Sequence, residues 1–266
     1  MLSRYFVYFI IYSFLGWIYE TCYCTIHEKS WQNRGFLYGP VIPLYGVGAT
    51  LAQILFVDLP LPIPANHKYL VIFLGCAVGS FILEYGTSYV LELRFHARWW
   101  DYSEFPLNIN GRVCLIFTLL FGFAGIVVTQ FIVPPIVTLL AYFPVFLIDL
   151  LSLIFMFLFG MDMALTVSAL TTFAKEFERI NDQINAQMAE KVLTMTEKWD
   201  KNSERFEELK EQLSSAAVSE WIKNATETQR GQFRHIAKFT HPVASTKALL
   251  TKGSDYLRNK KKNKSA

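Results

Sequence analysis

Residues 113–133 read VCLIFTLLFGFAGIVVTQFIV and contain no charged side chain. A helix needs about 20 consecutive apolar residues to cross the hydrocarbon core of a bilayer. A single segment in lipid must satisfy its own backbone hydrogen bonds, and an α-helix does so. This stretch therefore predicts a transmembrane helix and sets the fold class of the chain.

Four further apolar runs of similar length accompany this one. They lie near residues 4–25, 38–57, 69–91 and 144–169. The run at 38–57 is weak, because Pro40 and Pro43 lie in its first half and proline removes a backbone donor and kinks a helix. The apolar stretch between Pro134 and Pro144 is too short to span, so we expect an interfacial turn or helix there. The pattern predicts an all-α membrane bundle of about five spans.

Charge divides the chain into a membrane half and a polar tail. Only seven of the 25 Lys and Arg residues and nine of the 22 Asp and Glu residues precede residue 173, which does not fit a globular enzyme. From Phe173 to Leu213 apolar side chains recur every three or four residues, the period of an amphipathic helix. We expect a transmembrane bundle at 1–172, a long amphipathic helix or coiled coil at 173–214 and a basic cytoplasmic tail at 215–266. The coil either joins copies of the chain or packs on another helix or the membrane.

Basic residues in the connections predict the orientation, because cytoplasmic loops carry an excess of Lys and Arg. The basic residues of the first and third connections are Lys29, Arg34, Arg94, Arg98 and Arg112. On the opposite side lie only Arg4 and Lys68. We therefore expect a multi-pass protein of the cytoplasmic membrane with its N-terminus outside and its C-terminus inside. The basic tail suits anionic lipid, and no nucleic-acid-binding module is recognisable.

The third connection is richer in polar and aromatic residues than a simple tether needs. It contains WWDYS at 99–103 and NINGR at 108–112. Trp and Tyr favour the membrane–water boundary, where the ring is buried and the polar atom stays hydrated. Beside Asp101 and Arg112, these side chains indicate a built site. The simpler alternative is that the loop ties the cytoplasmic ends of the helices together.

Two carboxylates lie inside the predicted spans. Glu20 and Glu84 each lie about 10 Å from the cytoplasmic end of their helix, where an ionisable group costs several kcal/mol unless it is paired or hydrated. They form either structural ion pairs with nearby arginines or a polar cavity open to the cytoplasm. The candidate site comprises Glu20, Arg34, Tyr38, Glu84, Arg98, Trp99, Trp100, Asp101, Tyr102, Asn108, Asn110 and Arg112, with Asp162 as a secondary member.

Small residues predict one close helix contact. Gly75 and Gly79 form a Gly-x-x-x-Gly pattern in the third run, and such spacing lets helices approach closely. The four cysteines lie in or at the ends of apolar runs without a zinc spacing, so we interpret them as small buried side chains.

Several motifs in combination resemble one bacterial family. Residues 12–20 read YSFLGWIYE, 33–40 read NRGFLYGP, 43–46 read PLYG, 98–103 read RWWDYS and 108–115 read NINGRVCL. Together they resemble the family called Putative ABC-transporter type IV, or CmpB, over roughly residues 5–165. The resemblance implies a polytopic membrane protein and an ABC transporter permease. It supplies no catalytic or substrate-binding residue.

The sequence lacks the motifs of common enzymes. It contains no P-loop, no His-Glu-x-x-His and no Gly-x-Ser-x-Gly pattern, so an ATPase for a permease must be a separate chain. We expect no enzymatic activity, no cofactor and no metal. Two function hypotheses follow: a transport component with a polar cytoplasm-facing cavity, or a membrane scaffold or regulator that acts through its tail. A lipid-acting enzyme would need a nucleophile or metal that we do not find.

Overall fold

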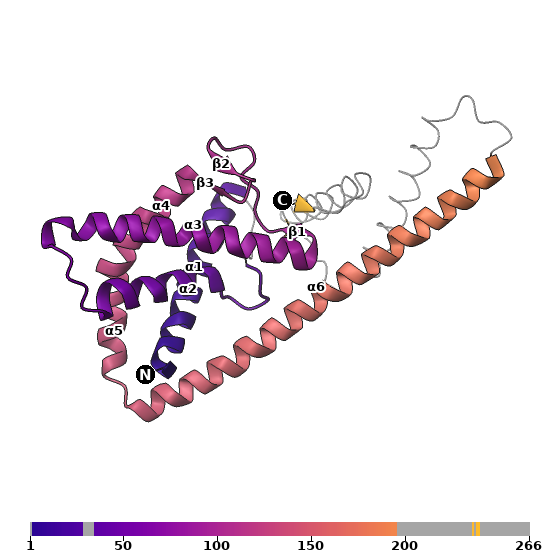
Figure 1. Ribbon diagram of the computed structural model, residues 1–266. Helices are drawn as coiled ribbons and strands as arrows, with labels where there is room; N and C mark the ends of the chain where they lie inside the picture. The colour runs from indigo at the N-terminus through magenta and orange to yellow at the C-terminus, as the bar shows by residue number, and fades with distance from the viewer. Residues whose placement is uncertain (1, 29–34, 196–235, 237, 240–266) are drawn as a thin grey trace. The chain divides into compact units, whose positions relative to one another are not determined.

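The computed structural model describes residues 2–28, 35–195, 236 and 238–239, and most of this part is helical (Figure 1). The α-helices are α1 (Leu2–Glu28), α2 (Pro43–Gln53), α3 (Lys68–Phe95), α4 (Leu115–Val127), α5 (Val133–Ala141) and α6 (Val145–Met195). Two π-helical turns, η1 (Ile54–Asp58) and η3 (Val128–Ile132), continue α2 and join α4 to α5. A 3-10 turn, η2 (Ala65–His67), leads into α3.

The chain divides into two compact units. The first comprises residues 1–90 and 100–166, and the second comprises residues 91–99 and 167–266. Within the first, β2 (Asn108–Ile109) pairs antiparallel with β3 (Val113–Cys114). Within the second, β1 (Ala97–Arg98) pairs antiparallel with β4 (Lys238–Phe239).

Three helical segments are long and apolar enough to cross a membrane. They are Ala65–Phe95, Leu115–Ala141 and Val145–Thr172. They correspond to the runs predicted at 69–91, 113–133 and 144–169, and they confirm a mostly helical membrane protein.

The first two predicted spans stay predictions. Helix α1 has 27 residues, which is long enough, but its tyrosines, Ser13 and Glu20 make it less apolar than the other three. Helix α2 with η1 covers Pro43–Asp58, about 24 Å at 1.5 Å per residue. That length falls short of the roughly 30 Å of hydrocarbon.

The fourth span is longer than its apolar run predicted. In place of a separate interfacial element after Pro134, α5 continues the helical path to Ala141. The prolines lie in the first turn of α5, where a missing N–H costs no intrahelical bond. The π-helical η3 precedes them, and Thr129 Oγ1 donates to the carbonyl of Gly125 at 2.8 Å.

Glycines set the closest helix contacts. A Cβ atom at Gly46 of α2 would meet Ser13 Oγ and the backbone oxygen of Phe9 in α1. A Cβ at Gly125 of α4 would meet Cys76 of α3. Gly79 has no described atom within 4 Å of such a Cβ, so only Gly75 of the predicted pair packs closely, against Phe56 of η1.

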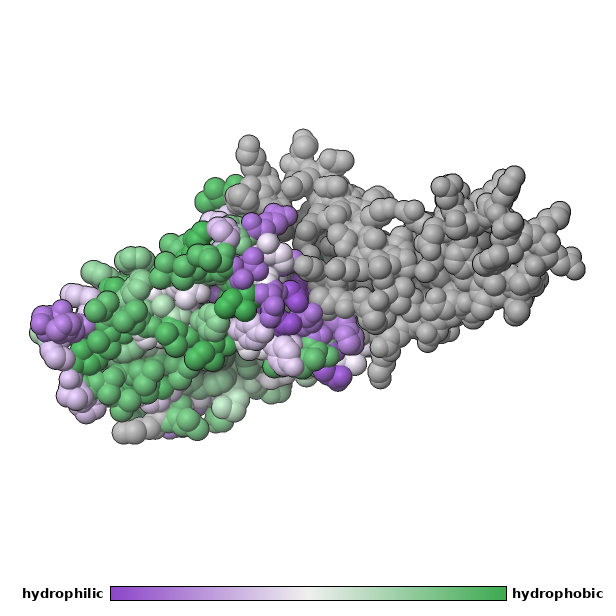
Figure 2. Space-filling model, turned by 45° about the horizontal axis from the view of Figure 1, so that its top comes forward, coloured by the Kyte–Doolittle hydropathy of each residue, from purple (hydrophilic) through white to green (hydrophobic). Residues whose placement is uncertain are grey.

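The surface of the first unit suits lipid. Apolar side chains cover much of the coloured part of the face drawn in Figure 2. Large exposed apolar residues occur on each of the three long segments, for example Val78, Phe123 and Phe157. Apolar surface of this extent on a helical protein needs a partner or the hydrocarbon of a bilayer to cover it.

Candidate functional site

The loop between α3 and α4 folds on itself through hydrogen bonds. Trp100 Nε1 donates to the carbonyl of Arg112 at 2.9 Å. The backbone N–H of Tyr102 donates to the carbonyl of Gly111 at 2.8 Å. The carboxylate of Asp101 accepts from the N–H and hydroxyl of Ser103 at 3.2 and 2.5 Å, so it shapes the loop from within.

A tight turn at residues 109–112 closes this loop. Asn110 and Gly111 have positive φ angles of 54° and 67°, which these two residue types tolerate in hairpin turns. The N–H of Arg112 donates to the carbonyl of Ile109 at 3.0 Å. Asn108 Oδ1 accepts from the N–H of Gly111 at 3.0 Å. The asparagines and glycine of the NINGR sequence therefore build the turn.

Helix α3 presents a buried carboxylate to this loop. Glu84 is only 4% exposed. Its Oε1 accepts a hydrogen bond from the hydroxyl of Tyr102 at 3.4 Å, and its Oε2 has no partner among the described residues. Burial raises the pKa of the Tyr102 hydroxyl above its ordinary value, and the charges of Glu84 and Glu20 raise it further. The hydroxyl therefore stays protonated and can donate a hydrogen bond.

Helices α1 and α2 add a second carboxylate beside the first. Tyr45 donates from its hydroxyl to Glu20 Oε2 at 2.7 Å. The Tyr45 ring lies against Gly16, where any Cβ would clash with it. Glu20 lies within electrostatic range of both Glu84 and Tyr102. We call Glu20, Tyr45, Glu84 and Tyr102 the carboxylate cluster.

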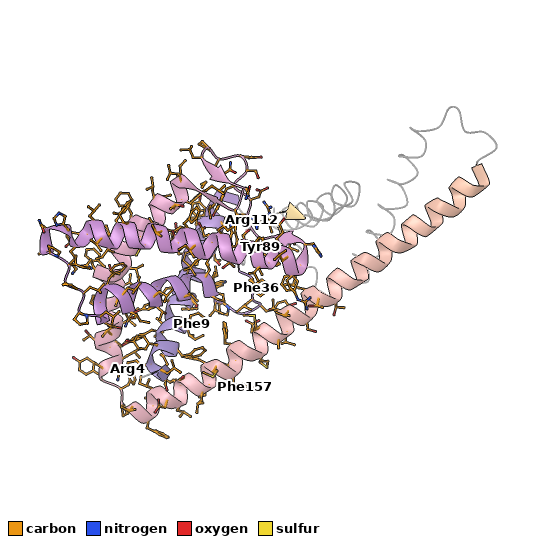
Figure 3. The ribbon with its side chains drawn as sticks, viewed as in Figure 1. Arg4, Phe9, Phe36, Tyr89, Arg112 and Phe157 are labelled. Atoms are coloured by element: carbon orange, nitrogen blue, oxygen red, sulfur yellow. The ribbon has the colours of Figure 1, made fainter. Side chains whose placement is uncertain are left out.

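One arginine that the sequence offered as a partner for these carboxylates, Arg112, contacts aromatic rings of α3. Arg112 is 9% exposed, and its guanidinium carbon lies 5.4 Å from the ring centroid of Tyr85 and 5.2 Å from that of Tyr89. Arg112 and Tyr89 are labelled in Figure 3. Such cation–π contacts stabilise a buried guanidinium. Asn110 Nδ2 donates to the Tyr85 hydroxyl at 3.2 Å, so the turn and the arginine both contact α3.

Arg98 and Trp99 belong to the second unit. Arg98 pairs with Glu92 through two hydrogen bonds, Nε to Oε2 at 2.6 Å and Nη2 to Oε1 at 3.1 Å. Trp99 is 8% exposed and packs edge-to-face on Phe95 with ring centroids 6.0 Å apart. Arg34 lies outside the described residues.

Asp162 of α6 binds the irregular, non-helical segment that precedes α2. Its Oδ1 accepts from the N–H of Tyr38 at 3.0 Å, and its Oδ2 accepts from the N–H of Gly39 at 2.8 Å. Thr166 donates to Oδ1 at 3.3 Å. A Cβ at Gly39 would lie 2.8 Å from Oδ2. Asp162 therefore accepts hydrogen bonds from two backbone N–H groups that have no partner within a helix. Irregular backbone is tolerated inside a membrane only where protein groups or water satisfy it in this way.

The predicted site residues that the structure describes, all but Arg34, thus fall into four groups. These are the carboxylate cluster with Glu20, Glu84 and Tyr102, the folded loop with Trp100, Asp101, Asn108, Asn110 and Arg112, the second unit with Arg98 and Trp99, and the Asp162–Tyr38 contact. Among the described residues, no group of three or more His, Cys, Asp and Glu side chains gathers as metal ligands do.

Sequence reasoning missed Tyr45 and a second polar network. Gln53 and Asp58 near the end of α2 and η1 hydrogen-bond with Tyr12 and Tyr5 of α1. The sequence could have indicated this network. Positions 5 and 12 share one helical face, and Gln53 and Asp58 are polar residues in an apolar stretch.

The sequence profile of one family matches residues 7–167, more than half of the chain. That family is described as Putative ABC-transporter type IV. The chain belongs to this family. No curated protein and no solved structure matches the chain.

Membership in the family described as Putative ABC-transporter type IV confirms the resemblance carried by the sequence motifs. With the apolar helices, it identifies an ABC-transporter-related membrane protein. The matched residues contain the carboxylate cluster, the folded loop and Asp162. The polar tail lies outside them.

Proposed function

We propose that this chain is the permease component of a transporter and that the carboxylate cluster lines a polar site open to the cytoplasm. One observation carries the proposal: Glu84 is 4% exposed, and its Oε2 has no partner among the described residues. A buried acceptor of this kind costs free energy unless a ligand, a proton or water satisfies it. Intramembrane carboxylates in this state are typical of substrate and ion pathways.

The cluster favours a substrate group that donates hydrogen bonds or carries positive charge. Both tyrosine hydroxyls already donate to the carboxylates. The remaining capacity is the acceptor oxygens of Glu20 and Glu84, which suit an ammonium, an amide or a proton. Aromatic rings close one side, because the Tyr102 ring stacks on Phe117 with centroids 4.8 Å apart.

We propose that α1 and α2 with η1 enter the bilayer beside the three long apolar segments. Five crossings then place the N-terminus outside and the C-terminus in the cytoplasm, as the loop charges predict. In this orientation the carboxylate cluster and the folded loop lie near the cytoplasmic side of the inner membrane. The basic tail, with its terminal lysines, would contact anionic lipid.

The energy source in this proposal is a separate ATPase subunit, because the chain has no P-loop of its own. No residue of this chain is assigned a catalytic role. Gentle affinity purification from native membranes, followed by mass spectrometry, should recover an ATPase subunit in near-stoichiometric amount. Repeated recovery of intact permease without one would contradict this partnership.

Glu84→Gln should abolish transport while leaving the fold intact, because glutamine keeps the size and the Tyr102 hydrogen bond but not the ionisable oxygen. Inside-out vesicles containing the complex are given ATP and a mixture of small metabolites, and lumenal contents are quantified by mass spectrometry. We expect ATP-dependent accumulation of at least one compound with the wild-type chain and at least about tenfold less with Glu84→Gln.

Asp149→Asn is the matched control, since Asp149 is an exposed carboxylate of α6. It should leave accumulation unchanged. Equal accumulation by the Glu84→Gln and wild-type chains would contradict the site. Equal accumulation with and without the chain would contradict the transport function itself.

A scaffold or regulator is the second candidate function, and helix α6 favours it. This helix has 51 residues and runs to Met195, well past the apolar segment that ends at Thr172. If the chain acts through its tail, deletion of residues 174–266 should abolish partner recruitment and the cellular phenotype while the membrane half stays folded. Unchanged ATP-dependent accumulation by the deleted chain would instead favour the permease.

A further inference from the structure

A hydrogen-bond network ties the first residues of α1 to the end of η1. Tyr12 donates to Gln53 Oε1 at 2.6 Å, and Gln53 Nε2 donates to Asp58 Oδ2 at 3.2 Å. Tyr5 donates to the same Asp58 oxygen at 2.9 Å. Gln53 is 1% exposed and Tyr12 is 3% exposed, whereas Asp58 is exposed. The network therefore runs from the surface into the α1–α2 interface.

Two hydroxyls continue this line toward the carboxylate cluster. Ser13 is 0% exposed, and its Oγ has no partner among the described residues. It points at α2, because a Cβ at Gly46 would clash with it. Thr50 Oγ1 is buried and likewise without a described partner. Positions 46, 50 and 53 share one face of α2, since they are four and three residues apart.

We call this line of polar side chains the α1–α2 seam. Its members are Tyr5, Tyr12, Ser13 and Glu20 of α1, Tyr45, Thr50 and Gln53 of α2, and Asp58 of η1. All of them lie in the first unit. The seam begins at one carboxylate, Asp58, and ends at another, Glu20, which is in electrostatic range of Glu84.

Buried hydroxyls in a membrane helix pair are normally satisfied by a backbone carbonyl or a neighbouring side chain. Two such hydroxyls without a described partner, between two hydrogen-bonded carboxylates, point to a polar path with exchangeable partners. Hydroxyl groups both donate and accept, so each can receive a proton on one side and release one on the other.

We propose that the α1–α2 seam is a proton path between Asp58 and the carboxylate cluster. A proton that binds an Asp58 oxygen passes through water and the hydroxyls of Tyr12, Thr50 and Ser13 to the carboxylate of Glu20. The Gln53 amide carries no proton itself and holds the Tyr12 hydroxyl in place. At each step one O–H bond forms as another breaks, so charge and atoms balance without an oxidant or reductant. Water is part of the path, because positions 53 and 45 are about 12 Å apart along α2.

The charges around the seam favour a cation. Its ends carry Asp58 and Glu20, with Glu84 beside the latter. Among the described residues, the titratable groups that face Asp58 are Tyr5, Tyr8 and Tyr12, and those that face Glu20 are Tyr19, Cys24, Tyr45, Glu84 and Tyr102. Arg4 is the basic group in electrostatic range of Tyr8 at the Asp58 end. This inference rests on the proposed function in one respect, since the proton path would deliver protons to the proposed substrate site.

The test uses the purified full-length chain in liposomes that contain the pH-sensitive dye pyranine. A potassium diffusion potential set with valinomycin drives protons inward. We expect the wild-type chain to acidify the lumen at least about tenfold faster than protein-free liposomes do. Thr50→Val removes one hydroxyl with little change of shape, and it should lower the protein-dependent rate about tenfold.

Thr118→Val is the matched control, because Thr118 Oγ1 of α4 is also buried without a described partner but lies outside the seam. It should leave the rate unchanged, and both variants should melt at the wild-type temperature. Asp58→Asn should also slow acidification, which tests the path without altering a buried position.

Wild-type liposomes that acidify no faster than protein-free ones would overturn the proton path, as would equal rates for Thr50→Val and the wild-type chain. In either case ATP-dependent metabolite accumulation can still be present, and the permease proposal would stand. Proton flux without any metabolite accumulation would instead support the path and contradict the permease. Sodium entry at the proton rate would identify a general cation pore and overturn the proton assignment.

Discussion

Gly46→Ala is expected to destabilise the membrane half by about 2–3 kcal/mol, the usual cost of overpacking a tight contact. The added Cβ would meet Ser13 Oγ and would lie 2.6 Å from the backbone oxygen of Phe9. A side chain can rotate away from such a clash, but a helix carbonyl moves only when α1 itself shifts. The substitution therefore forces apart the two helices that carry the seam and Tyr45.

Thermal unfolding of the purified chain in detergent measures this effect, and Gly79→Ala is the control. Gly79 has no described atom within 4 Å of an added Cβ. Alanine there should leave the free energy of unfolding unchanged or raise it by up to about 1 kcal/mol, because alanine has the higher helix propensity. Equal melting temperatures for the two variants would contradict the α1–α2 contact.

Asp162→Asn is expected to cost about 2–4 kcal/mol, because hydrogen bonds to charged groups contribute about 1.5–3 kcal/mol each. The two carboxylate oxygens accept the N–H groups of Tyr38 and Gly39 at 3.0 and 2.8 Å. Asparagine keeps one oxygen and turns an amide donor toward the other N–H. One backbone donor then loses its acceptor.

Hydrogen exchange of residues 35–42, followed by mass spectrometry, localises this loss. Exchange there should accelerate in Asp162→Asn, and the melting temperature should fall. Asp149→Asn on the exposed part of the same helix should change neither quantity. Unaltered exchange in Asp162→Asn would mean that this contact does not hold the segment.

Sequence predicted the parts of this protein that depend on local hydrophobicity. The run 113–133 has no charge over its whole length, and a helix is the structure that satisfies such a segment's backbone in lipid. The structure is helical from Leu115 onward, and only Val113 and Cys114 form a strand instead. Family membership was also predictable, because the motifs at 12–20, 33–40 and 98–115 are specific in combination. We predicted no turn at Asn110-Gly111, although this pair is typical of hairpin turns, since few residue types adopt the backbone angles found there.

Side-chain partners were not predictable, because they depend on how each helix is rotated against its neighbours. Arg112 was a candidate partner for Glu84 by topology alone, yet it lies over the rings of Tyr85 and Tyr89. Glu84 instead contacts Tyr102, and Glu20 contacts Tyr45. The short length of α2 with η1 was also not predictable, because the apolar run in the sequence continues beyond both ends of the helix.

The bond between Asp162 and the backbone before α2 has a consequence for the synthesis of the chain. Tyr38 and Asp162 are 124 residues apart, so the ribosome completes the first four apolar segments before the acceptor for these N–H groups exists. During that interval Tyr38 and Gly39 must find temporary partners. The segment before α2 can therefore form these hydrogen bonds only after Asp162 of α6 has been synthesised, and a chain truncated before Asp162 lacks them.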